Sequence, residues 1–189
     1  EGVSKLLNII GIGSAYPEIV IHNNDLVRIR QATDFSRIFP EVKVKARRSS
    51  LLLSYLEETG NSDPFKVPDV ALMTPTELGA AAATDALKSA GIEVEKLGLI
   101  IGDSSTPYET TPSEGQRITG SLGLKGVSFD MTGASCALSL HLSTLSKWKD
   151  ERIPDYTLLV STNVPTQNID YRSGTEAAFF GDAASAVVV

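Results

Sequence analysis

The sequence has little cysteine, little histidine and no long apolar run. Its single cysteine, Cys136, excludes an intrachain disulfide. Two histidines and one cysteine argue against a structural zinc site, so we expect no bound metal. Apolar stretches such as Leu51–Leu53 and Val187–Val189 are far shorter than the ~20 residues that span a bilayer. Nothing at the N-terminus resembles a signal peptide, so we expect a cytoplasmic protein without a membrane partner.

Positive charge is also scarce. The sequence has 17 Lys and Arg residues against 23 Asp and Glu, which gives a formal net charge of −6. This balance argues against a nucleic-acid partner. With 42% hydrophobic and 21% charged residues the composition is that of a globular protein rather than a disordered one. A length of 189 residues allows one large domain or two small ones.

Strand-like and helix-like patterns alternate along most of the chain. We predict strands over 6–12, 97–101, 127–131, 156–161 and 183–189, the first closed by a turn at Gly13-Ser14. We predict helices over 25–31, 50–58, 75–90, 112–122 and 135–148. The fourth helix has the start signature Thr111-Pro112-Ser113-Glu114. This alternation indicates an α/β fold around a largely parallel sheet.

Two segments do not fit an ordinary domain. Residues 34–72 have no clean period and contain three prolines, so we expect an irregular excursion that lines or covers a site. The chain also stops inside the valine-rich strand pattern 183–189, which would leave an unprotected edge. We therefore expect a fragment, or one half of something that pairs.

Residues 127–136 form the segment with the clearest chemical potential. A predicted strand runs into small residues, then Ser135 and Cys136, then a helix. A sharp turn of this kind projects a side chain at a helix N-terminus, which suits a thiolate or alkoxide nucleophile. The alternative is structural: Ser135 caps the helix and Cys136 is a small buried filler. From spacing alone, the structural alternative is the more common one.

Four segments, in the same order, resemble β-ketoacyl-acyl-carrier-protein synthase III of the thiolase superfamily. They cover nearly the whole chain outside the irregular excursion. The resemblance implies the N-terminal half of a thiolase-like fold over 1–189, with a mostly parallel five-stranded mixed sheet, helices on both faces and the C-terminal half absent. The segments are Ile10–Glu18 with Asn24–Leu26, Ala90–Ile92 with Leu97–Ile101, Val127–Ser139, and Phe180–Val187.

The resemblance implies an acyltransferase of fatty acid or polyketide biosynthesis that passes an acyl group from a thioester through a covalent acyl-enzyme, with or without decarboxylative condensation. In that family the nucleophilic Cys lies five residues after the Asp that matches Asp130, and here this position is Ser135. Three interpretations stay open: Ser135 is the nucleophile, a one-residue shift presents Cys136, or the protein is a non-catalytic, dimer-forming subunit. An unrelated α/β ligand-binding domain is the alternative outside the family.

The two histidines do not supply the missing base. His141 lies six residues after Ser135, about 600° of rotation and ~9 Å of rise along a helix, so it faces elsewhere. It shares an apolar stripe with Leu138, Leu142, Leu145 and Trp148, and we expect a buried, hydrogen-bonded structural residue. We expect His22 to be solvated in a polar loop. The resemblance places the family's catalytic His and Asn in the C-terminal half.

Basic residues are concentrated in the segment 28–48, which has a local charge of +5. This patch suits the phosphates of coenzyme A or an acidic carrier protein, although a solvated loop is an equal alternative. The resemblance implies an acyl-CoA or acyl-carrier-protein phosphopantetheine substrate and no bound cofactor, with Arg47, Arg48 and Arg172 as candidate substrate-binding residues. The loop has Asp34-Phe35-Ser36 where the family has a Trp that stacks on adenine, which slightly favours the carrier protein.

The resemblance also implies a homodimer. In the family two N-terminal halves pair across the dimer axis into a continuous sheet. We expect the seam at Val127–Met131, with the loop Thr106–Pro112 reaching across it towards the partner's site.

Overall fold

The computed structural model describes residues 7–30, 38–173 and 175–189. These residues form two compact units. The sheet unit takes in the chain up to Ala15, then Pro75–Asn163 and Ala184–Val189, and the hairpin unit consists of Tyr16–Thr74 and Val164–Ala183. Each unit is therefore assembled from segments that are distant in the sequence.

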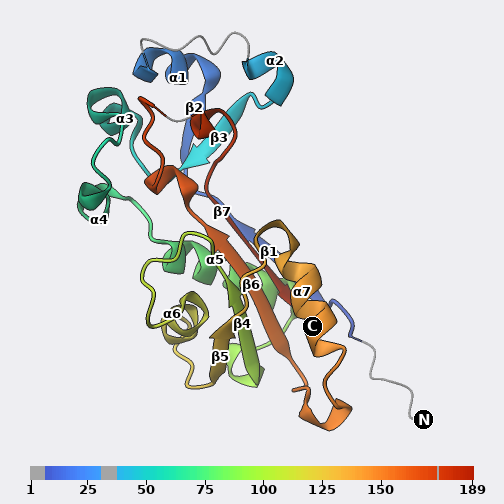
Figure 1. Ribbon diagram of the computed structural model, residues 1–189. Helices are drawn as coiled ribbons and strands as arrows, with labels where there is room; N and C mark the ends of the chain where they lie inside the picture. The colour runs from blue at the N-terminus through green and yellow to red at the C-terminus, as the bar shows by residue number, and fades with distance from the viewer. Residues whose placement is uncertain (1–6, 31–37, 174) are drawn as a thin grey trace. The chain divides into compact units, whose positions relative to one another are not determined.

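The sheet unit contains a five-stranded mixed sheet in the order β1-β7-β6-β4-β5 (Figure 1). Strand β4 runs parallel to both β5 and β6, whereas β7 runs antiparallel to β1. The main chains of Thr157 and Val189 exchange two hydrogen bonds, as opposed residues of antiparallel strands do. The predicted α/β fold with a mostly parallel five-stranded sheet is confirmed. The strands are β1 (Gly11–Ala15), β4 (Leu99–Asp103), β5 (Val127–Asp130), β6 (Thr157–Asn163) and β7 (Ala183–Val188).

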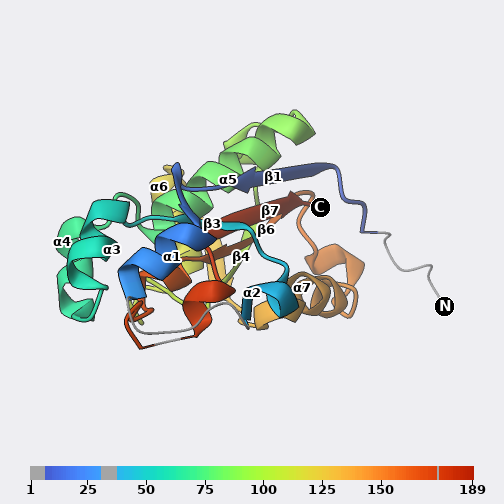
Figure 2. The ribbon, with the colours of Figure 1, turned by 90° about the horizontal axis from the view of Figure 1, so that it is seen from above.

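Helices cover both faces of this sheet (Figure 2). Helices α5 and α6 lie on one face and α7 lies on the other. On the α7 face, Leu145 is buried together with Leu99 and Ile101 of β4. On the opposite face, a Cβ at Gly79 of α5 would lie 2.6 Å from Ile118 of α6, so these two helices are in close contact. The helices are α5 (Pro75–Ala90), α6 (Glu114–Ser121) and α7 (Ala137–Leu145).

The first strand lies further along the chain than predicted, and Gly13-Ser14 is part of it rather than a turn. The reason is the close packing of β1 on α5. A Cβ at Gly11 would lie 2.4 Å from the carbonyl oxygen of Ala86, and one at Gly13 would lie 2.3 Å from that of Ala82. Glycine in a strand marks a close backbone approach here.

Helix α6 also begins later than its predicted start at 112. It starts at Glu114, and the side chain of Gln116 accepts a hydrogen bond of 3.0 Å from the backbone N–H of Ser113. A Ser-x-x-Gln pattern is itself a helix-start signal, and it overrides the Thr111-Pro112 pattern two residues earlier. The other predicted helices and strands of the sheet unit differ from the structure mainly at their ends, and the helix predicted over 135–148 is shorter, at Ala137–Leu145.

The hairpin unit contains the segment predicted to be an irregular excursion. Strands β2 and β3 pair antiparallel, with Ile19 opposite Ser49 and His22 opposite Ala46. His22 therefore ends a strand instead of lying in a polar loop, although its side chain is exposed as predicted. The elements are β2 (Ile19–His22), α1 (Asn23–Arg30), α2 (Ile38–Val42), β3 (Ala46–Ser49), α3 (Leu53–Thr59) and α4 (Val67–Val70).

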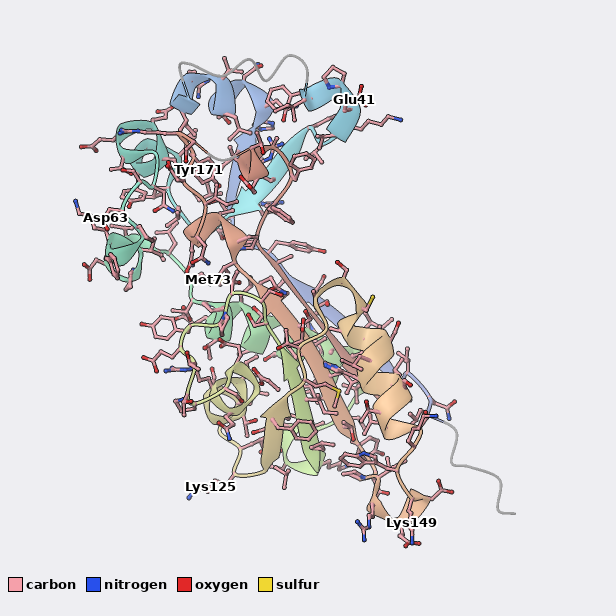
Figure 3. The ribbon with its side chains drawn as sticks, in the orientation of Figure 1. Glu41, Asp63, Met73, Lys125, Lys149 and Tyr171 are labelled. Carbon is pink, nitrogen blue, oxygen red and sulfur yellow. The ribbon has the colours of Figure 1, made fainter. Side chains whose placement is uncertain are left out.

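From residue 38 onwards the prediction of an irregular excursion is wrong, although the helix predicted within it over 50–58 is present as α3. Residues 34–37 lie outside the described residues. The unit has its own apolar core, in which Ile21, Leu26 and Leu56 are buried with Ile169 and Tyr171. Tyr171 lies among the elements of this unit in Figure 3. Because the core joins residues more than a hundred positions apart, no local period in the sequence reveals it.

No helix among the described residues combines the length and the apolar character needed to cross a membrane.

Candidate active site

The chain bends sharply between β5 and α7, as predicted. Strand β5 ends at Asp130, a single 3-10 turn spans Ala134–Cys136, and α7 begins at Ala137. Ala134 has a φ of +45°, in the left-handed region that a residue with a Cβ adopts only at a cost of ~1–2 kcal/mol. The surrounding contacts hold the backbone in this strained form, as is common at functional turns.

Three hydrogen bonds fix the residues immediately before the turn. The N–H of Met131 donates to the carbonyl oxygen of Gly102 over 2.9 Å, and the Met131 carbonyl accepts a 2.7 Å bond from Nε2 of His141. The N–H of Gly133 donates to Oδ1 of Asp103 over 3.0 Å. The turn is therefore anchored to β4 on one side and to α7 on the other.

The turn leaves Ser135 and Cys136 exposed. Cys136 is the residue that precedes α7, and its backbone N–H donates to the Gly133 carbonyl over 2.9 Å. Its side chain makes no cap hydrogen bond, and the thiol is not packed into the core. The structural interpretation of Cys136 as a buried filler is therefore wrong.

His141 is structural, as predicted: it is 1% exposed and bonded to the Met131 carbonyl. Because that carbonyl can only accept, Nε2 of His141 donates this hydrogen bond. Leu145 of the predicted stripe is also buried, but Leu138 is 43% exposed. A cavity of about 30 Å³ lies between α7 and the strands β6 and β7, with Ala137, Leu138 and His141 lining its helix side.

Asp130, from which the nucleophile position is counted, supports helix α6. Its carboxylate accepts hydrogen bonds of 3.0 and 2.7 Å from the backbone N–H groups of Glu114 and Gly115. A negative charge at a helix N-terminus is stabilising. A Cβ at Gly115 would lie 2.7 Å from this carboxylate, so the contact requires glycine there. Asp130 therefore has a structural role in the described part of the chain.

Sequence reasoning missed Asp103, the last residue of β4. Its carboxylate is 1% exposed and accepts hydrogen bonds from Gly133 and from the Ser161 hydroxyl. The only signal in the sequence is an aspartate two residues after the apolar run Leu99–Ile101. Its partner in the turn lies 30 positions further along the chain, where no local pattern points to it.

The three arginines predicted to bind substrate all lie in the hairpin unit. Arg47 is buried, and its two terminal nitrogens donate to Asn23 Oδ1 over 2.7 Å and to the Ala178 carbonyl over 2.6 Å. Burial lowers the pKa of its guanidinium. Its terminal nitrogens are thus committed to holding the unit together, whereas its Nε has no hydrogen-bond partner among the described residues.

The other two arginines are exposed but also bonded to the main chain. Arg48 donates to the carbonyl oxygens of Glu18 and Pro17 over 3.1 and 3.3 Å, and Arg172 donates to that of Glu58 over 2.8 Å. Because both side chains are exposed, the substrate-binding role of Arg48 and Arg172 stays a prediction.

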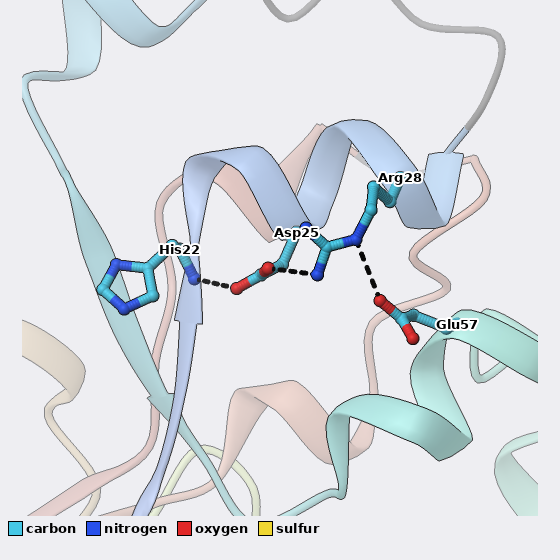
Figure 4. Close-up of polar contacts among 4 residues, drawn as sticks. All are labelled: His22, Asp25, Arg28 and Glu57. Carbon is cyan, nitrogen blue, oxygen red and sulfur yellow. Dashed lines mark hydrogen bonds and ion pairs between the residues drawn. The ribbon is translucent and has the colours of Figure 1, made fainter.

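Arg28, at the start of the basic segment, is paired within the hairpin unit (Figure 4). It donates to Asp25 over 2.6 Å and to Glu57 over 3.1 Å. Asp25 also accepts the backbone N–H of His22 over 2.7 Å. Lys43 and Lys45 of the same segment are exposed, while Arg37 lies outside the described residues. The +5 charge of the segment is therefore partly neutralised by internal contacts.

Metal-ligand clusters are absent from the described ranges: no three or more His, Cys, Asp or Glu side chains come together there.

The chain is similar to curated β-ketoacyl-[acyl-carrier-protein] synthase III proteins of bacteria. It is 28% identical over 184 residues to the protein of Clostridium acetobutylicum, which covers 97% of this chain and 50% of that protein. It is 29% identical over 182 residues to the protein of a Nostoc species, with 96% and 49% covered. The solved 3-oxoacyl-(acyl carrier protein) synthase III of Pseudomonas aeruginosa PAO1 matches with a TM-score of 0.75 at 25% identity, covering 95% of this chain and 50% of that one.

The chain is thus similar to synthase III proteins over nearly its whole length. Its fold is thiolase-like, so the resemblance inferred from four sequence segments is confirmed. The chain spans about half the length of the curated relatives it matches. No protein-family model matches it.

The similarity to synthase III and the geometry of the turn together leave two exposed residues as candidates for the nucleophile. Ser135 stands at the family's nucleophile spacing from Asp130, and Cys136 follows it directly at the N-terminus of α7. In the described part of the chain, neither side chain is hydrogen-bonded to a group that could act as a base. His141 and Asp103 hold the turn instead of touching the two residues.

Proposed function

We propose that the complete protein is an acyltransferase of the 3-oxoacyl-acyl-carrier-protein synthase III type, with the acyl group carried on Ser135 or Cys136. The observation that carries the proposal is the anchored, strained turn that exposes both side chains at the start of α7. Similarity to synthase III proteins along 97% of the chain supports the same reaction class.

The proposed acylation step transfers the acyl group from the carrier's thioester to the protein, where it forms a new thioester on cysteine or an oxygen ester on serine. The serine oxygen or cysteine sulfur bonds to the thioester carbon and gives up its proton. The bond from that carbon to the carrier's sulfur breaks, and the sulfur leaves as a thiolate that takes up a proton to become the carrier's thiol. Negative charge develops on the nucleophile and on the acyl oxygen, and the N-terminus of the nine-residue helix α7 favours it there.

The two candidate nucleophiles differ in what they need. A thiol reacts at neutral pH with little assistance, whereas a serine hydroxyl requires a positioned base. Because the described residues near the turn supply no such base, a serine mechanism depends on groups from elsewhere in the complete protein. A family member that has lost catalysis and serves as a dimer-forming subunit remains the second candidate function, favoured by the serine at the family's cysteine position.

The acyl donor is proposed to be a coenzyme A or carrier-protein thioester, and no other cofactor is invoked. We extend the proposal to a cytoplasmic homodimer in fatty acid or polyketide biosynthesis. Strand β5 supports the dimer, because it lies at the edge of the sheet and its Val127 is 66% exposed. An exposed apolar edge strand is a template for pairing with another chain.

The test uses the full-length protein, incubated separately with acyl-CoA and acyl-carrier protein and then analysed by intact mass spectrometry. We expect a mass increase of one acyl group that is lost in either Ser135→Ala or Cys136→Ala, which identifies the nucleophile. Ser139→Ala is the matched control, because Ser139 is an exposed serine on α7. Absence of an adduct with both donors would reject the enzyme in favour of the non-catalytic subunit.

A further inference from the structure

Asp103 is a buried carboxylate held only by neutral donors among the described residues. It is 1% exposed, and its Oδ2 accepts a 2.6 Å bond from the Ser161 hydroxyl while its Oδ1 accepts the 3.0 Å bond from the N–H of Gly133. Burying a carboxylate without a cation is costly, so such a residue calls for an explanation beyond packing.

The bond to Gly133 connects Asp103 to the residues that could react. Gly133 donates its backbone N–H to Asp103, and the carbonyl of the same residue accepts the N–H of Cys136 over 2.9 Å. Asp103 therefore holds the residue whose carbonyl closes the 3-10 turn around Ala134 and Ser135. A Cβ at Gly133 would lie 3.1 Å from the Cα of Ala137, so a side chain at this position would crowd the start of α7.

The bond to Ser161 makes the support rigid. Ser161 lies on β6, and its hydroxyl accepts a 3.4 Å contact from the side-chain amide of Asn163. The amide oxygen of Asn163 in turn accepts the N–H of Ser105 over 2.8 Å. These bonds tie the carboxyl ends of β4 and β6 together, which is where open α/β sheets carry their sites. Asp103 cannot shift without disturbing both strand ends.

We propose that Asp103 is a positioning residue that holds the turn in the form that presents Ser135 and Cys136 to an acyl donor. It acts through Gly133 and touches no reacting atom. The inference rests on the proposed function, because it assigns a role within the same site.

The test compares two substitutions in the full-length protein. In Asp103→Asn the amide oxygen still accepts the Gly133 N–H, and the Ser161 hydroxyl can rotate to accept from the new amide nitrogen. In Asp103→Ala both bonds are lost. We expect Asp103→Ala to slow acylation at saturating donor by about tenfold or more, because small displacements of a reacting group are costly, with the half-saturating donor concentration unchanged. Asp103→Asn should stay within about threefold of the parent protein.

The matched control is Asp85→Ala in the same unit. Asp85 makes a similar bond, accepting the N–H of Ser14 over 3.0 Å, but on an exposed surface of α5. This variant should acylate at the parent rate. A parent rate in Asp103→Ala, or equal losses in the alanine and asparagine variants, would overturn the positioning role.

Hydrogen exchange separates this inference from the proposed function. Backbone amides of 131–137 should exchange faster in Asp103→Ala than in the parent protein, and Asp103→Asn should restore the slow exchange. This result supports the anchoring role even if the parent protein forms no acyl adduct, in which case only the proposed function fails. If Asp103→Ala does not fold, the asparagine variant decides: fast exchange at 131–137 in that variant overturns the role.

Discussion

Asp182 shows how one side chain organises the hairpin unit. Its buried carboxylate accepts hydrogen bonds of 2.6–2.9 Å from the backbone N–H groups and the hydroxyls of Ser50 and Thr166. These two residues lie 116 positions apart in the sequence. Burial raises the pKa of Asp182 above its ordinary value of 3.8, although the four bonds oppose this.

The raised pKa of Asp182 predicts a definite pH dependence of stability. The folded protein holds this proton more tightly than the unfolded chain does, so the group's stabilising contribution is complete below pH 3.8 and is lost as the pH rises through the raised pKa. Relative to Asp182→Asn, the parent protein should lose about 1.4 kcal/mol for each unit by which the pKa is raised. The measurement is urea unfolding of both proteins at a series of pH values that starts below 3.8 and rises through the raised pKa of Asp182.

The control for this prediction is Asp85→Asn, since Asp85 is an exposed carboxylate. Its stability difference from the parent protein should stay within about 0.5 kcal/mol across the range. A pH-independent difference between the parent protein and Asp182→Asn would contradict the assignment.

Single residues were predictable from the sequence where their chemistry is local. His141 was predictable because its helical spacing separates it from Ser135 and places it on an apolar stripe. Arg47 was not, because two adjacent arginines in a polar segment resemble an exposed patch. The acceptors that let Arg47 be buried, Asn23 and Ala178, come from other parts of the chain.

At the scale of elements, the contact between β1 and α5 depends on glycine. A Cβ at Gly13 would lie 2.2 Å from the backbone nitrogen of Ala86, and neither backbone can move away freely. We predict that Gly13→Ala lowers the free energy of unfolding by about 3 kcal/mol through overpacking. Gly126→Ala is the control, because nothing lies within 4 Å of a Cβ at that position.

Denaturant unfolding of the two glycine variants checks this prediction. Equal stabilities of Gly13→Ala and Gly126→Ala would show that β1 does not need its close approach to α5. The same contact explains an error at this scale: the glycines of β1 resemble a turn in the sequence, and only the helix packed on them shows why they occur in a strand.

At the scale of the whole molecule, the sheet was predictable and the hairpin unit was not. Buried runs such as Leu99–Ile101 of β4 are apolar on both faces and stand out from their surroundings. The hairpin unit is built from elements of four to eight residues whose core partners come from 164–183. Propensity over such short windows carries little information, so long-range packing decides the structure.

The edge strand β5 gives a prediction about assembly. If two copies pair through β5, Val127→Lys in the full-length protein should convert a dimer into a monomer, because lysine on an edge strand blocks pairing. Light scattering coupled to size exclusion measures the mass. The control is Val27→Lys, since Val27 is also exposed, at 52%, but lies on α1. A Val127→Lys protein that stays dimeric would place the interface elsewhere.

The location of a bound acyl group on the full-length protein tests the central claim most directly. After reaction with an acyl thioester and proteolysis, tandem mass spectrometry assigns the modified residue. The account predicts one acyl group within the peptide that contains Ser135 and Cys136, on one of these two side chains. An acyl group found only at another residue would show that the exposed turn before α7 is not where the chemistry occurs.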